Sequence, residues 1–327
     1  MNIAVIGGAG YIGSHAVKLL IERGHNVTAI DNLSMGHRAA VHPKARLVVM
    51  DCANAAALAA VFQANKIEAV MHFAASAYVG ESVQDPRKYY RNNVSNTISM
   101  LDAMNLAGVK KLVFSSTCAT YGEPQRVPIT EDLPQNPISP YGQSKLMVEH
   151  ILKDTAHAEG LAFAAPRYFN VAGSALDGSI GEDHRPETHL IPIVLQVALG
   201  QRPAVDIFGN DYPTADGTCI RDYIHVWDLV DAHLVLLENL RPGRGLFYNL
   251  GVGRGYSVRE IIEACRKVTG KTIATRETAR RAGDPPALFA SPERMAKDFS
   301  WKAKITDLNQ IVESAWRWFQ ANPNGYR

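Results

Sequence analysis

The sequence has no excess of charge of either sign and no long hydrophobic run. Its 327 residues carry 34 Lys and Arg against 32 Asp and Glu, which gives no electrostatic reason to expect nucleic acid or an anionic membrane as a partner. Every hydrophobic run is shorter than the roughly 18 residues that a membrane-spanning helix needs. We therefore expect neither a nucleic acid nor a membrane partner.

Cysteines are few and far apart, and none forms a CxxC pair: Cys52, Cys118, Cys219 and Cys265. This spacing argues against a disulfide framework and against a zinc site. We predict reduced thiols, a cytoplasmic location and no bound metal. The first strand is predicted to begin at Asn2, so we expect no signal peptide before it.

Short apolar runs alternate with helical patterns through the first half of the chain. The apolar runs lack an inside/outside alternation, which is typical of strands that are buried on both faces of a parallel sheet. This order predicts an α/β fold with a Rossmann-type doubly wound parallel sheet. The predicted strands are Asn2–Gly7, Asn26–Asp31, Arg46–Asp51, Ala69–Ala75, Lys111–Ser116 and Ala162–Arg167, and the predicted helices are Ile12–Arg23, Asn54–Asn65, Arg87–Ala107 and a segment from Pro140 to about His157.

The pattern changes after Val171, where Pro and Gly become frequent and the elements become short. We predict a dinucleotide-binding domain over residues 1–170 and a smaller mixed α/β substrate lobe over residues 171–327, part of which returns to the first domain. Ligands of such folds bind outside the carboxyl ends of the strands, between the lobes. Helices are predicted in this lobe near His189–Gly200, Ser257–Thr269 and Thr306–Gln320.

A glycine-rich segment joins the first predicted strand to the first predicted helix. Gly7, Gly10 and Gly13 let the backbone turn tightly and bring N–H groups to a pyrophosphate at the helix N-terminus. Asp31 ends the next strand, where its carboxylate can accept hydrogen bonds from the adenosine ribose. Its charge would repel a 2′-phosphate, so NAD is favoured over NADP. The alternative is a structural turn without a ligand.

A tyrosine and a lysine lie four residues apart in the segment Ser139-Pro140-Tyr141-Gly142-Gln143-Ser144-Lys145. Ser139 is a typical N-cap and Pro140 a typical first helical residue. On a helix, Tyr141 and Lys145 share one face. A nearby ammonium lowers the pKa of a phenol, which makes Tyr141 a candidate general base. The alternative is an accidental pair on a solvated helix face.

Three hydroxyl residues end a predicted strand that precedes this pair: Ser115, Ser116 and Thr117. A hydroxyl there can hydrogen-bond the reacting oxygen and share a proton transfer, although capping of the strand end explains at least one of them. Asp51 and Asn92 are weaker candidates for contacts with the cofactor.

These features together resemble the extended short-chain dehydrogenase/reductase family. A longer series of motifs, which spans Asn2 to about Tyr326, resembles the UDP-glucose 4-epimerase (UDP-galactose 4-epimerase) branch of that family. In chain order the motifs are GGAGYIGSH, Asp31-Asn32, HFAASAYVGESV, YYRNNV, KLVFSST, SPYGQSK, RYFNVAG, IFGNDYPTADGTCIRDYIHV and YNLGVG.

The resemblance implies an NAD-dependent isomerase that inverts C4 of a UDP-hexose through a 4-keto intermediate, with NAD tightly bound. It assigns Tyr141 as the base, Lys145 as its electrostatic partner and Thr117 as the assisting hydroxyl. The implied cofactor contacts are Gly7, Gly10, Tyr11, Ile12, Gly13, Asp31, Asn32, Asp51, Cys52, Phe73, Ala74, Ala75, Asn92, Ser115, Tyr141, Lys145 and Tyr168.

The same resemblance implies a UDP-sugar site in the second lobe. Arg221 and Arg281 would hold the two phosphates, Asp284 a uridine ribose hydroxyl, and the backbone at Phe208 the uracil. The implied substrate contacts are Thr117, Tyr141, Asn170, His189, Leu190, Phe208, Arg221, Tyr223, Arg281, Asp284 and Leu288. The family also implies a homodimer, with contact faces near Arg87–Ala107 and Ser144–Lys153.

The chain departs from the family pattern at two positions, and both bear on the substrate. Ala77 stands where some members carry a lysine, so one phosphate contact is absent or supplied elsewhere. Leu288 stands where some bacterial members carry a bulky aromatic residue, which leaves more room for the sugar. UDP-GlcNAc and UDP-GalNAc therefore stay open as alternative substrates. UDP-xylose and UDP-arabinose stay open as well, because the same catalytic residues make no use of C6 of the sugar.

Two other activities are weighed against C4 epimerisation. Related dehydratases and decarboxylases carry acidic residues just after the strand-end hydroxyl, whereas Cys118 and Ala119 follow Thr117 here. A non-catalytic NAD-binding regulator is the remaining alternative, and such proteins usually lose the tyrosine or the lysine.

Overall fold

The computed structural model describes residues 1–281 and 284–326. The chain divides into two compact units, each formed by three segments. The first unit contains Met1–Glu123, Pro134–Arg167 and Val230–Tyr248, and the second contains Pro124–Leu133, Tyr168–Leu229 and Asn249–Arg327. Which ligand each unit binds stays a prediction.

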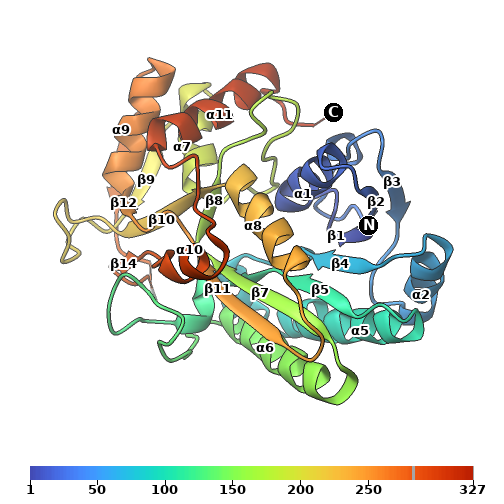
Figure 1. The fold of residues 1–327 in the computed structure, drawn as a ribbon. Helices are drawn as coiled ribbons and strands as arrows, with labels where there is room; N and C mark the ends of the chain where they lie inside the picture. Colours follow the sequence, from blue (N-terminus) through green and yellow to red (C-terminus); the bar gives the residue numbers. More distant parts are fainter. Residues whose placement is uncertain (282–283, 327) are drawn as a thin grey trace. The chain divides into compact units, whose positions relative to one another are not determined.

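The first unit is built on the predicted parallel sheet (Figure 1). The strand order is β11-β7-β5-β4-β1-β2-β3, and the short β6 pairs with β7. The pairs β1–β2, β1–β4, β2–β3, β4–β5 and β5–β7 are parallel. The direction of winding reverses at β1, which is the switch point of a doubly wound sheet. The strands are β1 Asn2–Ile6, β2 Asn26–Asp31, β3 Arg46–Val49, β4 Ala69–His72, β5 Lys111–Phe114, β6 Ser116–Thr117, β7 Ala162–Tyr168 and β11 Gly245–Leu250.

Helices cover both faces of this sheet, so the fold is the α/β Rossmann type that the sequence predicted. Figure 1 shows α2 (Ala55–Ala64), α5 (Asn96–Leu106) and α6 (Pro140–Glu159) on one face, where they bury a continuous apolar core. It shows α1 (Tyr11–Glu22) on the other face, together with the part of α8 (Val226–Glu238) that belongs to this unit. No helix of the described residues is both long and apolar enough to cross a bilayer.

Several predicted helix ends are confirmed. Arg23 caps α1, and Gly24 follows it with φ +81°, a conformation that favours glycine. The hydroxyl of Ser139 accepts a hydrogen bond from the backbone N–H of Gly142 at 3.2 Å, so Pro140 begins α6 as predicted. The cap and the proline therefore place Tyr141 in the first turn of α6.

The predicted helix Arg87–Ala107 is interrupted in the structure. It consists of a short helix α4 (Pro86–Tyr89), a π-helix (Tyr90–Ser95) and α5. The π-turn directs the buried Asn93 inward, where its amide donates to the Ser76 carbonyl and to the Ser144 hydroxyl, both at 3.0 Å. A π-turn adds a residue to a helix without a clear sequence signal, which explains why an uninterrupted helix was expected.

Other predicted elements differ in length or burial. The strand predicted over Arg46–Asp51 ends at Val49, and its residues are half-exposed because β3 lies at the edge of the sheet. The strand predicted over Ala69–Ala75 ends at His72, and the one over Lys111–Ser116 ends at Phe114. No helix was predicted for residues 226–238, where the structure has α8. Frequent Pro and Gly in the neighbouring segments made its helical pattern hard to recognise in the sequence.

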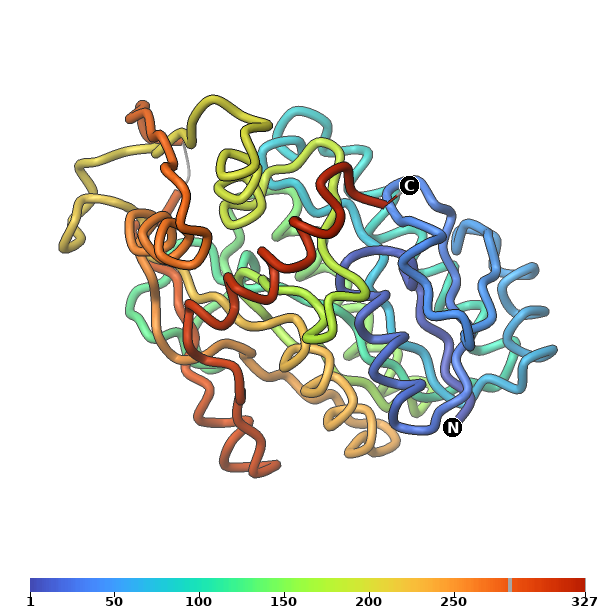
Figure 2. Tube along the Cα trace, turned by 90° about the horizontal axis from the view of Figure 1, so that it is seen from above, coloured from blue at the N-terminus to red at the C-terminus, as the bar shows by residue number. Residues whose placement is uncertain are grey.

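The second unit has a separate core built from helices and short strands. Its helices α7 and α9 are confirmed near their predicted positions, and α11 begins two residues later than predicted. Helices α9 and α11 lie side by side over that core, as Figures 1 and 2 show. The elements are α7 Leu190–Ala198, α9 Val258–Thr269, α10 Glu293–Phe299, α11 Leu308–Ala321, β8 Asn170–Ala172, β9 Val205–Phe208, β10 Ile220–His225, β12 Gly255–Ser257, β13 Thr275–Thr278 and β14 Ala287–Leu288. The remaining short elements of the chain are α3 Val79–Gln84 and the 3-10 turns Arg38–Ala40 and Cys118–Tyr121.

A buried ion pair joins α6 to the sheet of the first unit. The carboxylate of Glu149, which is fully buried, accepts two hydrogen bonds from the guanidinium of Arg167, at 2.9 and 2.7 Å. It also accepts bonds from the Ser116 hydroxyl at 2.6 Å and from the Gln135 amide at 3.0 Å. The two buried charges therefore compensate each other, and these hydrogen bonds hold α6 in one position on β6 and β7.

We expect Glu149→Gln to lower the free energy of unfolding by about 3 kcal/mol, because the Arg167 guanidinium would stay buried without a counter-charge. Chemical denaturation followed by circular dichroism measures the change. Glu159→Gln is the matched control on the same helix, since its side chain is 45% exposed and its ion pair with Lys110 is long at 3.7 Å. The control should change stability by less than about 0.5 kcal/mol. Equal effects of the two substitutions would contradict a structural role for the buried pair.

Candidate active site

The predicted cofactor residues gather along one edge of the parallel sheet. Strand β1 ends at Ile6 and leads into Gly7, while Phe73 and Ala74 follow β4 and donate their N–H groups to the Ile6 carbonyl. Ser115 follows β5 and donates its N–H to the His72 carbonyl at 3.0 Å. The carboxyl ends of parallel strands therefore meet here, as the fold class predicts for a ligand site.

The glycine-rich loop packs too closely for a side chain at Gly7 or Gly13. A Cβ atom on Gly13 would lie 1.9 Å from the Gly7 carbonyl oxygen, and one on Gly7, which has φ +80°, would lie 2.6 Å from the Ala74 nitrogen. Gly10 is the N-cap of α1 and makes no side-chain capping bond. The loop thus leaves the positive end of α1 accessible to a ligand, and this arrangement suits the pyrophosphate of a dinucleotide.

Asp31 holds the loop from the end of β2. Its Oδ2 accepts from the Ala9 N–H at 3.0 Å, and its Oδ1 accepts from the Leu33 N–H at 2.8 Å. A Cβ on Gly36 would come within 2.9 Å of Oδ2, so glycine is needed there too. A carboxylate accepts about four hydrogen bonds, which leaves capacity for ribose hydroxyls. The loop and this carboxylate together fit NAD.

Further predicted cofactor residues lie beside Asp31. The Asn32 amide donates to the Asp51 carboxylate at 3.0 Å, which links the ends of β2 and β3. Cys52 follows Asp51, and burial together with the Asp51 charge raises the pKa of its thiol to about 11, so the thiol stays protonated. The amide of Asn92 in the π-helix donates to the Ser76 hydroxyl at 3.2 Å. Tyr168 is the last residue of β7.

Tyr141 and Lys145 lie on consecutive turns of α6, at the same edge. The Lys145 side chain is buried, its Nζ donates to the Ser115 carbonyl at 2.8 Å, and it lies 4.7 Å from the centroid of the Phe114 ring. The Tyr141 ring meets the Tyr89 ring edge to face, with centroids 6.4 Å apart. Lys145 is thus fixed to the strand end that precedes Thr117, and Tyr141 is only partly buried.

Burial lowers the pKa of Lys145 to about 7. The Ser115 carbonyl and the face of the Phe114 ring both favour the ammonium form, yet desolvation opposes them and dominates. Lys145 therefore titrates near neutral pH: its positive charge is present at lower pH and is lost as the pH rises through 7. Burial also lowers the pKa of the neighbouring His72, with a smaller contribution from Lys145, to about 3, so this imidazole is neutral.

Two of the strand-end hydroxyls, those of Ser116 and Thr117, make different contacts. Ser116 donates to Glu149, so its hydroxyl belongs to the buried ion pair. The Thr117 Oγ1 accepts from the Ala119 N–H at 3.1 Å, which caps the 3-10 turn but leaves the O–H able to donate. Thr117 is therefore better suited than Ser116 to assist at a reacting oxygen, in agreement with the role that the resemblance implies.

In the second unit, two arginines flank one carboxylate. Arg281 Nε donates to Asp284 Oδ2 at 2.9 Å, and Arg221 Nη2 lies 3.5 Å from Asp284 Oδ1. Arg221 is further held by the carbonyls of Ile220 and Pro285. The Arg281 guanidinium lies 4.8 Å from the centroid of the Phe208 ring. Two guanidinium groups against one carboxylate leave a positive excess, which suits a diphosphate.

Neighbouring strands bring other predicted substrate residues to the same place. Tyr223 on β10 pairs with Asn170 on β8, and Arg221 pairs with Leu288 on β14. Burial raises the pKa of Tyr223 to about 12, although Arg221 and a hydrogen bond with Asn170 oppose this, so its phenol stays neutral. Adjacent strands thus bring together Asn170, Arg221, Tyr223 and Leu288, and Asp284 joins them through its ion pair with Arg221.

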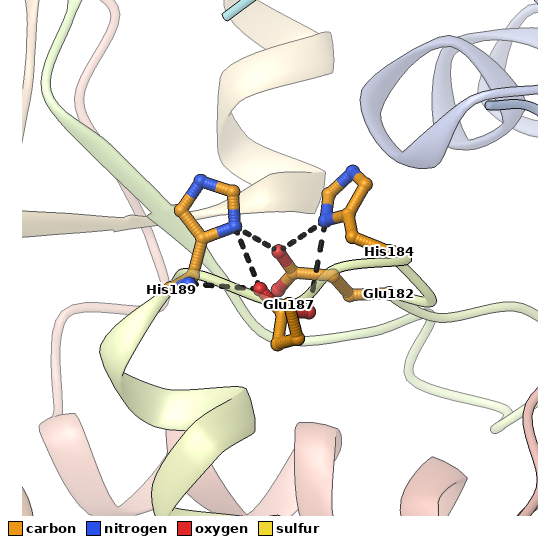
Figure 3. A group of neighbouring side chains, drawn as sticks. All are labelled: Glu182, His184, Glu187 and His189. Carbon is orange, nitrogen blue, oxygen red and sulfur yellow. Dashed lines mark hydrogen bonds and ion pairs between the residues drawn. The ribbon is translucent and has the colours of Figure 1, made fainter. Parts of the chain in front are cut away.

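His189 and Leu190 lie at the start of α7, where His189 is the N-cap. The Nδ1 atom of His189 faces the carboxylates of Glu182 and Glu187 and not the arginine pair, and His184 faces the same carboxylates (Figure 3). Burial lowers the pKa of both imidazoles, but the charge and hydrogen bonds of the two glutamates outweigh it and raise each above the ordinary value.

Two residues that position this edge were not predicted from the sequence. Asn93 ties the loop after β4 to α6, and Glu149 ties α6 to β6 and β7. Asn93 lies in the YYRNNV motif, so its place in that motif was an available signal. Glu149 lies in a helix rich in polar residues and carries no local signal, because its partner Arg167 is 18 residues away on another element.

The chain is similar to proteins of known family and known structure. Residues 3–251 match the model of the family described as the NAD dependent epimerase/dehydratase family. The chain belongs to this family. A UDP-glucose 4-epimerase of Lacticaseibacillus casei is 52% identical over 327 residues, which cover 100% of this chain and 99% of that relative.

Solved structures and a plant relative extend the comparison. A crystal structure of a UDP-glucose 4-epimerase has a TM-score of 0.97, with 49% identity and coverage of 100% of both chains. The UDP-glucose 4-epimerase from Brucella ovis, crystallised in complex with NAD, has a TM-score of 0.93, with 49% identity and coverage of 97% of this chain and 98% of that one. UDP-arabinose 4-epimerase 1 of Arabidopsis thaliana is 46% identical over 99% of this chain and 81% of its own length.

We expect the ammonium of Lys145 to lose its proton near pH 7 in the cofactor-free protein, because its Nζ is desolvated. NMR titration of protein with 13C-labelled lysine Cε atoms should show one resonance with a midpoint near 7, against an ordinary value of about 10.4. That resonance should disappear in Lys145→Arg. A titration in which every lysine shifts above pH 9 would contradict the prediction.

Proposed function

We propose that this chain, with bound NAD, catalyses the reversible C4 epimerisation of a UDP-hexose, which interconverts UDP-glucose and UDP-galactose. The observation that carries the proposal is the arrangement at the carboxyl edge of the first unit. There the partly buried Tyr141, the buried Lys145 and the Thr117 hydroxyl accompany a glycine-rich loop that fits a dinucleotide. The named 4-epimerases that match the full chain support the same reaction.

NAD, when bound, supplies the hydride acceptor and donor for C4 of the sugar. The chain supplies the proton steps. Tyr141 as phenolate takes the proton of the 4-hydroxyl during oxidation. After the 4-keto sugar has turned its opposite face toward the hydride donor, Tyr141 returns a proton to the oxygen at C4. Lys145 stabilises the phenolate while it carries its charge, and Thr117 donates a hydrogen bond to the sugar oxygen. NAD is unchanged over the cycle, so the enzyme needs no second redox substrate.

We propose that the second unit binds the nucleotide end of the substrate. Arg221 and Arg281 would contact the diphosphate, Asp284 the uridine ribose, Phe208 the uracil, and Asn170 and Tyr223 the diphosphate or sugar. Binding energy placed on UDP allows the hexose to be held loosely, and the ketone must turn before reduction. The ion pairs of Asp284 with both arginines support this proposal. A phosphate oxygen can take the place of the Asp284 carboxylate at each guanidinium.

The residues after Thr117 favour epimerisation over elimination or decarboxylation. Cys118 and Ala119 form the first turn of a 3-10 helix and provide no carboxylic acid to protonate a leaving hydroxyl. A non-catalytic NAD-binding regulator remains the main alternative outside enzyme catalysis. The retention of both Tyr141 and Lys145, with Lys145 fixed on Ser115, argues against it.

We further propose a cytoplasmic homodimer. Ile98 on α5 and Met147 on α6 are apolar side chains that are 43% and 39% exposed, and both lie on the helices expected to form the contact. The four cysteines are free thiols in the structure, in keeping with a reducing compartment. The molar mass from light scattering tests the dimer.

We expect Tyr141→Phe to lower kcat by at least about 100-fold, because the phenol would no longer transfer the sugar proton. Purified protein without added NAD is incubated with UDP-galactose, and UDP-glucose is measured by chromatography. Bound NAD should stay at the wild-type level, which separates lost chemistry from lost cofactor. Tyr326→Phe, the same change at a tyrosine near the C-terminus that has no proposed role in the site, should keep the wild-type rate. A fully active Tyr141→Phe enzyme would exclude Tyr141 as the base, and a wild-type protein that is inactive even with NAD would exclude the proposed reaction.

We expect the wild-type enzyme to convert UDP-GlcNAc as well as UDP-galactose, because Leu288 leaves room beside the sugar. Leu288→Tyr should lower the rate with UDP-GlcNAc by at least about 10-fold and change the rate with UDP-galactose much less. Leu288→Met, which keeps the volume, is the control. The same assay with UDP-xylose tests the pentose alternative. If UDP-galactose is converted and UDP-GlcNAc is not, Leu288 does not widen the specificity.

A further inference from the structure

Four metal-ligating side chains converge in the segment that precedes α7. Glu182, His184, Glu187 and His189 each offer one ligand atom, and the four atoms all lie within 4.8 Å of one another. Figure 3 shows both imidazoles turned so that their Nδ1 atoms face the two carboxylates. Convergence of two imidazoles and two carboxylates is the donor set of a divalent transition-metal site.

The nitrogen-to-oxygen distances in this cluster are close to the edges of a small tetrahedron. The Nδ1 atoms of His184 and His189 lie 3.1 and 2.8 Å from Glu182 Oε1. They lie 3.7 and 3.2 Å from the two oxygens of Glu187. Zinc bonds to nitrogen and oxygen of about 2.0–2.2 Å give ligand-to-ligand distances of about 3.3–3.5 Å in a tetrahedron. Because the four ligand atoms lie within 4.8 Å of one another, changes of at most about 1.5 Å in any separation would bring them to ligand positions.

The carboxylates of this cluster are buried and held in place. The side chains of Glu182 and Glu187 are 4% and 2% exposed, whereas that of His189 is 46% exposed, which provides an entry path for an ion. Glu187 Oε1 also accepts from the backbone N–H groups of Thr188 and His189, at 2.7 and 2.8 Å. Such outer hydrogen bonds orient a metal-ligating carboxylate. Zinc binding releases the Nδ1 protons of both imidazoles, and the two carboxylate charges that remain balance the divalent cation.

We propose that Glu182, His184, Glu187 and His189 bind one Zn²⁺ ion. Four protein ligands complete a tetrahedral shell, so the site is structural: it holds the segment 182–189 and the N-terminus of α7. No metal was expected from the sequence, because only the spacing of the cysteines was considered. The four ligands come together only when segment 182–189 folds back on itself. The proposal does not depend on the reaction proposed above, since zinc binding is measured without activity.

The test uses the full chain after treatment with a chelator and removal of the chelator. Titration with zinc, followed by dialysis and elemental analysis, should give one zinc ion per chain. His184→Asn should weaken zinc binding at least about 100-fold, because it removes a ligand. His157→Asn is the matched control: His157 lies exposed in the last turn of α6 and should leave zinc binding unchanged.

Cobalt(II) substitution and amide hydrogen exchange make the test specific. Bound cobalt should give tetrahedral d–d absorption without a thiolate charge-transfer band, which separates this site from binding at a cysteine. Zinc should slow amide exchange in residues 182–190 of the wild type but not of His184→Asn. Glu182→Gln provides a second ligand variant, and circular dichroism confirms that each variant is folded. No zinc above background, or equal zinc binding by wild type and His184→Asn, would overturn the proposal and leave an ion-pair cluster only.

Discussion

The edge of the sheet near Tyr141 and Lys145 depends on the position of α6, and the Glu149 carboxylate fixes that position. Glu149 lies one turn beyond Lys145 and two turns beyond Tyr141, and it receives hydrogen bonds from β6, β7 and the segment before α6. A helix fixed at that point cannot slide or rotate without leaving the Arg167 charge unpaired in the interior. Lys145 can therefore reach the Ser115 carbonyl. The first turn of α6, which carries Tyr141, packs against the turn that follows Thr117, where a Cβ on Gly142 would lie 2.5 Å from the Ala119 carbonyl oxygen.

The sequence allowed the first unit to be predicted well where the signals are local. The alternation of apolar runs and helical patterns identified the parallel sheet, and Ser139 with Pro140 located the start of α6. The glycine loop and Asp31 were found because both depend on short spacings around one strand–helix connection. Predicted strand ends were too long by two or three residues at β3, β4 and β5. Apolar residues continue past the end of β3 and β4, whereas two serines follow β5.

What the sequence could not reveal depends on distant contacts. The pair of Glu149 and Arg167 joins elements 18 residues apart, and a glutamate in a polar helix is usually solvated. The π-helix is visible only through the contacts that Asn93 makes with Ser76 and Ser144. In the second unit, the motifs identified the predicted substrate residues. Only the pairing of β8, β10 and β14 shows that residues as distant as Asn170 and Leu288 lie on neighbouring strands.

The bonds that Asp31 makes to Ala9 and Leu33 have a consequence for the lifetime of the bound cofactor. Because these bonds form within the protein, the glycine loop is ordered before a ligand arrives, and little conformational entropy remains to be lost on binding. A preordered site of this kind favours slow dissociation. An enzyme that regenerates its oxidant in every cycle has no use for cofactor exchange, so a rigid loop serves it better than a flexible one.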